Sequence, residues 1–455
     1  MRADKMEHNL QALMDPRAVE AVETLRGFGY EAWLVGGAVR DALRGVEPHD
    51  YDIAWNGAPQ DLFKAIDARY LHPTGVQHGT MTWVYRGLAM EVTSFRIEEG
   101  YGDHRRPDKV RFVDKIEDDL ARRDLTFNAM AWAPKEGLLD PFGGRTDLQA
   151  GRVRTVGDPY RRFSEDALRI LRTLRFTALL DGQLDPGTRT AIHAQAADLK
   201  HVARERIWNE LLQLLVLPGA GKVVFRGGRI LFEAFPQLQL PECTAEDIRY
   251  WRTATRLMDA LKDREELRVA WCYYIYFLGI LADDSLDQMN TMVMSWERTI
   301  KNEPLSRRLR GTVRALLTAL QELELDVRFR TSDESNRSRW MERFDALGHH
   351  ADPADLLSLI EASYNLVGGK RRAEILRHGQ ALFEGDGMTL RPGVLRSRRD
   401  LAVRGSDLLQ WGVTEGPAVR QALDALWRAV IAGEAPNERD RLRVYWESQN
   451  PKDKG

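Results

Sequence analysis

The stretch Leu34–Ala54 reads LVGGAVRDALRGVEPHDYDIA, and its pattern decides the fold of the chain around it. An apolar run ends in the pair Gly36 and Gly37, and the following AVRDALRG has helical spacing. Backbone N–H groups at such a strand-to-helix turn are open to an anion, and Arg40 would lie one turn into the helix. The stretch therefore predicts a strand, a phosphate-binding glycine turn and a helix.

Two carboxylates close the same stretch. Asp50 and Asp52 flank Tyr51 at the start of a second expected strand, where alternation places both on one face of the sheet. They would repel each other unless cations lie between them. Mg²⁺ suits this arrangement because it takes oxygen ligands from one or two carboxylates and from substrate phosphates. The spacing alone leaves a solvated strand edge or a helix cap as the alternative.

Composition indicates a globular protein with more than one domain. The chain has 455 residues, of which 43% are apolar and 29% charged. Sixty-six Lys plus Arg oppose 68 Asp plus Glu, so the formal charge of −2 indicates no global nucleic-acid-binding field. Basicity is local instead: Arg152–Arg175 holds seven arginines and three acids. Phosphate contacts depend on such local placement.

The number of cysteines and the length of the apolar runs indicate in which cellular compartment we expect the protein. Two cysteines, Cys243 and Cys272, exclude a disulfide framework and a four-thiolate zinc site, and they favour a reducing cytoplasm. The longest apolar run, Ala270–Ala282, is 13 residues long. A membrane-spanning helix needs about 18 or more. We therefore expect no membrane partner.

The periodicity of apolar residues changes after the first third of the sequence. Short β-type runs such as YDIAW and MEVTSF alternate with helical stretches up to about residue 150, whereas helical periodicity dominates from Pro159 onward. This predicts an α+β head with a mixed sheet, followed by helical parts. We place the parts at 1–150, 151–230, 231–385 and 386–455, with joints within 140–157, 217–228 and 385–404.

A second group of polar side chains lies in RRDLTFNAMAW, residues 122–132. Asp124 and Asn128 are four residues apart, so on a helix they can share one polar target such as ribose hydroxyls, with Arg123 beside them. The alternative is an ordinary helix cap and first turn.

A row of polar side chains at steps of three follows in SEDALRILRTLRF. On a helix Asp166 and Arg169 are close neighbours, Arg172 comes next, and Arg175 lies nearly opposite Asp166, where it could face RNA or a neighbouring helix. A carboxylate and a guanidinium can together recognise the edge of cytosine or adenine, whereas uracil and guanine present an acceptor to the carboxylate. The alternative is an intrahelical ion pair worth about a few tenths of a kcal/mol.

Taken in order, these elements resemble the polymerase-β-like nucleotidyltransferases, specifically the class II tRNA nucleotidyltransferases and the related bacterial poly(A) polymerases. The resemblance implies a polymerase-β-like head and a third acidic residue at Glu91. It also implies nucleotide contacts through RRD-x-x-x-N, and an EDxxR element, Glu165 to Arg169, that selects CTP and ATP without a nucleic-acid template. Further nucleotide contacts would fall on Arg172 and Arg175.

Two more stretches narrow the resemblance. The segment from Phe95 to Asp124, with Arg105 and Arg106 before Pro107, is similar to the flexible loop with which CCA-adding enzymes change from C to A. Leu401–Leu442 resembles the tail with which Bacillus-type CCA-adding enzymes contact the tRNA elbow. The resemblance implies a cytoplasmic, Mg²⁺-dependent enzyme that adds C and A to the tRNA 3′ end and releases pyrophosphate.

Three alternatives stay open at this point. They are an enzyme that adds only A, a poly(A) polymerase, and a catalytically idle RNA-binding relative. The full-length loop argues against an enzyme that adds only CC. The sequence does not indicate the oligomeric state.

Overall fold

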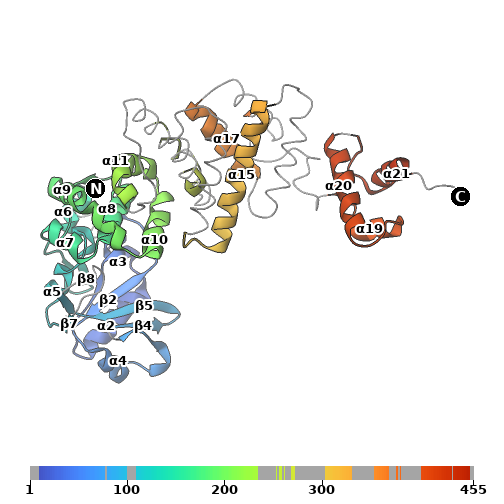
Figure 1. Ribbon diagram of the computed structural model, residues 1–455. Helices are drawn as coiled ribbons and strands as arrows, with labels where there is room; N and C mark the ends of the chain where they lie inside the picture. The colour runs from blue at the N-terminus through green and yellow to red at the C-terminus, as the bar shows by residue number, and fades with distance from the viewer. Residues whose placement is uncertain are drawn as a thin grey trace. The chain divides into compact units, whose positions relative to one another are not determined.

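The computed structural model describes residues 10–76, 79–99, 109–233, 303–329, 353–367, 401–432 and 434–450, and a few short pieces between 253 and 380 (Figure 1). The chain divides into two compact units, Met1–Gln239 and Leu240–Gly455. The finer division at residues 150, 230 and 385 stays a prediction.

The first unit is built on a seven-stranded mixed sheet with the strand order β3-β4-β5-β2-β1-β8-β9. Strands β2 and β5 are parallel, and the other neighbouring pairs are antiparallel. The strands are β1 Ala32–Val35, β2 Tyr51–Trp55, β3 Leu71–Gly75, β4 Thr80–Tyr85, β5 Leu88–Ser94, β8 Ala131–Ala133 and β9 Gly137–Leu139. The predicted α+β head with a mixed sheet is confirmed.

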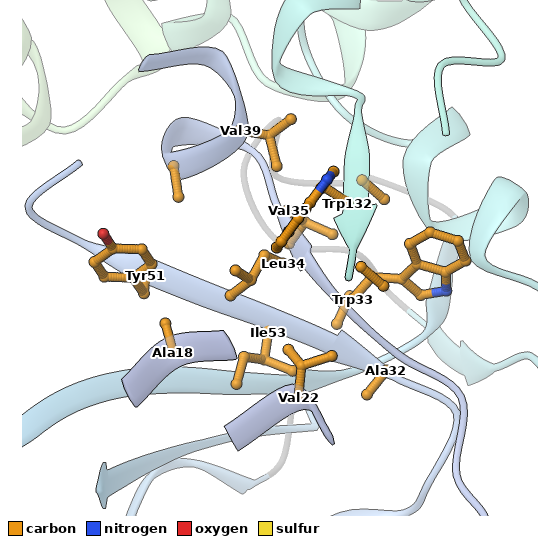
Figure 2. Packing of buried hydrophobic residues seen from close by; sticks show 14 of the residues in the cluster. Ala18, Val22, Ala32, Trp33, Leu34, Val35, Val39, Tyr51, Ile53 and Trp132 are labelled. Atoms are coloured by element: carbon orange, nitrogen blue, oxygen red, sulfur yellow. The ribbon is translucent and has the colours of Figure 1, made fainter. Parts of the chain in front are cut away.

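The centre of this sheet is a closed apolar core. Strand β1 is buried along its whole length because it lies inside the sheet and also packs against the helices α2 (Pro16–Gly27) and α3 (Gly37–Arg44). In Figure 2, Ala18 and Val22 of α2 gather with Leu34 of β1 and Ile53 of β2. Burial of these side chains fixes the strand ends, and the glycine turn and Asp52 belong to those ends.

Smaller elements surround the sheet. A two-stranded antiparallel ribbon, β6 with β7, precedes helix α5, and the segment after α5 closes with the short turn η3. Their bounds are β6 Arg96–Glu99, β7 Lys109–Phe112, α5 Ile116–Ala121, η3 Thr126–Asn128, α4 Pro59–Ala65, η1 Ala68–Tyr70, α6 Gly144–Gln149, β10 Arg152–Val153 and β11 Gln183–Leu184. The predicted loop residues Arg105, Arg106 and Pro107 lie outside the described residues.

Helices complete the first unit, with α8 packed against α10 and α11. They are α7 Pro159–Glu165, α8 Leu168–Leu179, α9 Pro186–Gln195, η4 Ala196–His201, α10 Arg204–Leu215 and α11 Ala220–Glu233. Most of the glycine-containing stretch 217–228, in which a joint is expected, is helical and belongs to α11. Ala220, Val223 and Val224 in this stretch are buried and α11 packs against α8, which overrides the weak helix propensity of glycine.

The described part of the second unit is helical. Its helices are α15 Arg307–Phe329, α17 Pro353–Val367, α19 Gly405–Gln410, α20 Pro417–Ala432 and α21 Arg439–Gln449. Among the residues that the structure describes, no helix is long and apolar enough to cross a membrane. Cys243, Cys272 and most of the run Ala270–Ala282 lie outside them.

Candidate active site

Acidic side chains meet at one edge of the sheet. Strand β2 lies between β1 and β5, with Asp52 opposite Val35 on one side and opposite Glu91 on the other. Asp50 is exposed and immediately precedes β2. Burial raises the pKa of Asp52; Arg123 opposes this rise, and the charges of Glu91 and Asp50 add to it. The predicted carboxylates therefore share one electrostatic environment.

These carboxylates suit a divalent cation. Every donor is a carboxylate oxygen, and a cation would relieve the mutual repulsion that acts on Asp52. Within the described ranges, no group of three or more His, Cys, Asp or Glu side chains is gathered so as to hold an ion by protein ligands alone. A cation here would thus need further oxygen ligands, such as those of a phosphate group. The assignment of Glu91 as a third acidic residue stays a prediction.

The glycine turn forms the second part of the site. Gly36 has a φ of +70°, a conformation that favours glycine, and its N–H donates to the carbonyl oxygen of Met130. A Cβ atom at Gly36 would lie 2.9 Å from Nη1 of Arg123. The absence of a side chain thus lets the Arg123 guanidinium pack against the turn. Gly37 begins α3, as expected.

Arg40 connects the turn to the RRD segment. Its Nη1 donates to Oδ1 of Asn128 at 2.9 Å, and its Nε and Nη2 donate to the carboxylate of Asp41. The guanidinium also lies 4.9 Å from the ring centroid of Phe176. The structure therefore brings the predicted Gly36, Arg40, Arg123 and Asn128 together.

Asp124 and Asn128 meet by a different geometry from the expected one. Asn128 Nδ2 donates to Asp124 Oδ1 at 3.1 Å, but the segment is a loop followed by η3, so the expected helix is wrong. Backbone pairing explains the difference: Thr126 N donates to the carbonyl oxygen of Arg154, and Val156 N donates to that of Asp124. These bonds hold the segment against residues 154–156, and the helical spacing could not reveal them.

An ion pair between the buried Asp124 and the half-buried Arg172 joins this loop to α8. Arg172 Nε donates to Asp124 Oδ2 at 2.8 Å. Burial would raise the pKa of Asp124, but the Arg172 guanidinium more than offsets it and holds that pKa far below its usual range. Asp124 also raises the pKa of Arg172. The predicted nucleotide residues of the two segments thus form one cluster.

Asp166 and Arg169 do not lie on one helix as expected, although Arg169 N donates to the backbone carbonyl oxygen of Asp166 at 3.0 Å. Asp166 is extended, with a φ of −151°, and separates α7 from α8. Its Oδ1 accepts from Leu168 N at 3.1 Å, so it caps the new helix instead of continuing the old one. Its Oδ2 accepts from Arg206 Nη2 at 2.7 Å, whereas Arg169 Nη1 donates to Glu165 Oε2 at 2.6 Å.

Arg175 faces a neighbouring helix, which was one of its two expected positions. Its Nε donates to Oε2 of Glu210 on α10 at 2.7 Å, and its guanidinium lies 4.4 Å from the ring centroid of Phe176. Glu210 Oε1 also accepts from Arg172 Nη1 at 3.4 Å. Arg175 therefore helps to fix α8 against α10.

Sequence reasoning missed the acidic and basic partners of these side chains. Glu165 accepts from Arg169, and Arg206 donates to Asp166. Glu210 accepts from both Arg172 and Arg175. Arg206 and Glu210 are four residues apart on α10, so they share one face of that helix. This spacing was the only sequence signal that pointed to the two residues together. Their partners are distant in sequence, and no local pattern could identify them.

Family models match three parts of the chain. Residues 32–154 match "Poly A polymerase head domain", and residues 183–224 match "Probable RNA and SrmB-binding site of polymerase A". Residues 394–445 match "tRNA nucleotidyltransferase domain 2 putative".

Relatives that match nearly the whole chain include CCA-adding enzymes of two bacteria. A CCA-adding enzyme of Geobacillus stearothermophilus is 32% identical over 438 residues, which are 95% of this chain and 96% of the relative. A CCA-adding enzyme of Lacticaseibacillus paracasei is 32% identical and covers 97% of both chains.

Solved structures agree with these relatives. The crystal structure of the Bacillus stearothermophilus CCA-adding enzyme in complex with CTP is 30% identical, with a TM-score of 0.64 and coverage of 96% of this chain and 98% of that one. The Thermotoga maritima CCA-adding enzyme complexed with tRNA-CCA shares the fold at 19% identity, with a TM-score of 0.62 and coverage of 98% and 99%.

We expect Gly36→Ala to impair nucleotide binding without unfolding the protein. Alanine at this φ costs roughly 1–3 kcal/mol, and its Cβ would displace the Arg123 guanidinium. The matched control is Gly87→Ala, which has a similar φ of +82° but no atom within 4 Å of its Cβ. Thermal unfolding should show a loss in both variants, and titration with CTP should show weaker binding only for Gly36→Ala. Equal CTP affinities for the two variants would contradict this account of the turn.

Proposed function

This chain belongs to the family of tRNA nucleotidyltransferases that includes the CCA-adding enzymes, and from that premise we propose that it adds C and A nucleotides to the 3′ end of tRNA. CTP and ATP would be its substrates and pyrophosphate its second product. The observation that carries the proposal is one cluster in the first unit. There the Gly36 turn, the carboxylate edge at Asp52 and the pair Asp124–Arg172 are linked by Arg123, Arg40 and Asn128.

The triphosphate has a cationic binding surface in this cluster. The N–H group of Gly37 at the start of α3 and the guanidiniums of Arg40 and Arg123 offer donors suited to phosphate oxygens. Asp124 and Asn128 present a carboxylate and an amide side by side, which can orient the ribose hydroxyls. These groups would hold the α-phosphate near the carboxylate edge.

Enzymes of this family use a divalent metal, and we propose Mg²⁺ bound by Asp50 and Asp52, with Glu91 nearby. Bound there, the metal would lower the charge on the attacking 3′-hydroxyl and on the departing pyrophosphate. The role of the protein would be to hold Asp50 and Asp52 at the start of β2, with Glu91 beside Asp52 on β5, so that the tRNA terminus and the α-phosphate meet at these carboxylates.

Base selection would depend on Asp166 and Arg169. The carboxylate of Asp166 can accept from the exocyclic amine of cytosine or adenine, and Arg169 can donate to a ring nitrogen or carbonyl. Both are already held by protein partners, Arg206 and Glu165, so their orientations are set before the nucleotide arrives. A preorganised pair discriminates better than a mobile one, because a wrong base cannot induce a new arrangement without cost.

Partner binding is proposed on the same basis. The tRNA 3′ end would enter the first unit, and residues 401–450, which include α19, α20 and α21, would contact the tRNA elbow. The expectation of a cytoplasmic enzyme stays a prediction.

One assay tests the proposed function. The protein is given tRNA ending before the first C, tRNA ending after CC, and unstructured oligo(A), each with labelled CTP or ATP and Mg²⁺. Extension of the first tRNA by exactly CCA is the expected result. Extension of the CC-ended tRNA alone would indicate an A-only enzyme. Long tails on oligo(A) would indicate a poly(A) polymerase, and the absence of any product would indicate an idle relative.

We expect Asp52→Asn to abolish most nucleotide incorporation while the affinity for tRNA is retained. Loss of a ligand to the metal removes charge stabilisation of the transition state and lowers the rate by about 10²-fold or more. Asp67→Asn, an exposed aspartate paired with Arg69 in the same unit, is the control and should retain full activity. Single-turnover extension and a filter-binding assay separate the two readouts. Wild-type rates in Asp52→Asn would refute the metal assignment.

We expect Arg169→Ala to lose selectivity for CTP and ATP over UTP and GTP, because one of the two base-reading groups is removed. A loss of about tenfold or more in the ratio of kcat/KM values corresponds to one charged hydrogen bond. The control is Arg161→Ala, since Arg161 also donates to Glu165 but is mostly exposed. Misincorporation is measured with each nucleotide alone. Unchanged selectivity in Arg169→Ala would count against the template role.

A further inference from the structure

Asp119 is a buried carboxylate outside the cluster described above. It lies on α5 with 1% of its surface exposed. Its Oδ1 accepts from Nε and Nη2 of Arg122 at 3.0 and 2.8 Å, and its Oδ2 accepts from Nη2 of Arg123 at 3.2 Å. Burying a charge is costly unless it is paired. The two consecutive arginines supply that pairing.

Asp119 fixes one end of the Arg123 guanidinium. Arg123 Nη1 lies against the Gly36 turn and donates to the carbonyl oxygen of Asn128 at 3.5 Å. The Nε of Arg123 is buried and has no hydrogen-bond partner in the part of the chain that the structure describes. The guanidinium is thus held at its two outer nitrogens, and the shorter of these contacts is the one to Asp119.

The other arginine connects Asp119 to the β6–β7 ribbon. Arg122 Nη1 donates to Oε1 of Glu98 at 3.0 Å, and Arg96 Nε donates to the same oxygen at 2.9 Å. Glu98 lies on β6 opposite Val110 of β7, and 9% of its side chain is exposed. Charges therefore alternate from the ribbon to the glycine turn through Glu98, Arg122, Asp119 and Arg123.

We propose that Asp119 is a positioning residue that fixes Arg123 against the glycine turn for nucleotide binding, and that Glu98 anchors this arrangement to the ribbon. The proposal rests on the proposed function, because it takes the nucleotide as the ligand of Arg123. Asp119 acts through Arg123 and does not itself contact the nucleotide. Its removal should therefore have no effect on nucleotide binding when Arg123 is absent.

Equilibrium binding of CTP, measured by calorimetry on the full chain without tRNA, tests the proposal. Asp119→Asn should weaken CTP binding about tenfold, the equivalent of one charged hydrogen bond, in the wild-type background. In the Arg123→Ala background the same substitution should change the dissociation constant less than twofold. An equal loss in both backgrounds, or no loss in the wild-type background, would overturn the proposal.

A matched control separates positioning from general destabilisation. Asp147 is equally buried and accepts from Arg154 Nε at 2.8 Å and from Thr126 Oγ1 at 2.7 Å. Asp147→Asn should lower the thermal stability as Asp119→Asn does, with a CTP affinity within about twofold of wild type. Loss of CTP affinity in proportion to stability in both variants would show a merely structural role for Asp119.

Glu98→Gln provides the test if Asp119→Asn does not fold. It leaves Asp119 and Arg123 intact, removes the anchor on the ribbon, and should weaken CTP binding by about threefold, again only when Arg123 is present. An unchanged CTP affinity would overturn the proposed arrangement. Failure of the proposed function is distinguishable, because the wild-type protein would then extend no tRNA in the incorporation assay.

Discussion

The ion pair between the buried Asp124 and the half-buried Arg172 is the interaction on which the candidate site depends. Asp124 belongs to the loop after α5, whereas Arg172 belongs to α8, so this contact at 2.8 Å is one of those that join the sheet-based part of the unit to its helical part. Loss of Arg172 would be destabilising, because it would leave the buried carboxylate of Asp124 without its paired cation. The pair therefore helps to hold the residues near the glycine turn and the residues of α8 in one cluster.

Paired charges recur throughout the cluster. Arg206 holds Asp166, Glu165 holds Arg169, Glu210 holds Arg172 and Arg175, and Asp119 holds Arg123. Most of these side chains are thus oriented by an oppositely charged partner within the protein. Such preorganisation lowers the entropy lost when the nucleotide binds, and it explains how a chain with a net charge of −2 can present a cationic site.

Sequence patterns predicted the sheet, the glycine turn and the gathering of most site residues. Asp52 lies near the start of the second strand, as expected, and the positive φ of Gly36 agrees with the expected turn. Helical periodicity was wrong at Asp166 and across Asp124–Asn128, because a side-chain cap and backbone pairing with residues 154–156 override it there. Contacts between distant segments, such as those of Arg206 and Asp119, depend on tertiary packing and leave no periodic signal.

A double-mutant cycle on CTP binding tests the central claim most directly. The dissociation constant is measured for wild type, Asp124→Asn, Arg172→Gln and the double variant. If the ion pair organises the site, each single variant loses most of the affinity and the double variant loses little more, which gives a coupling free energy of about 1–3 kcal/mol. Additive losses, with a coupling near zero, would contradict the account.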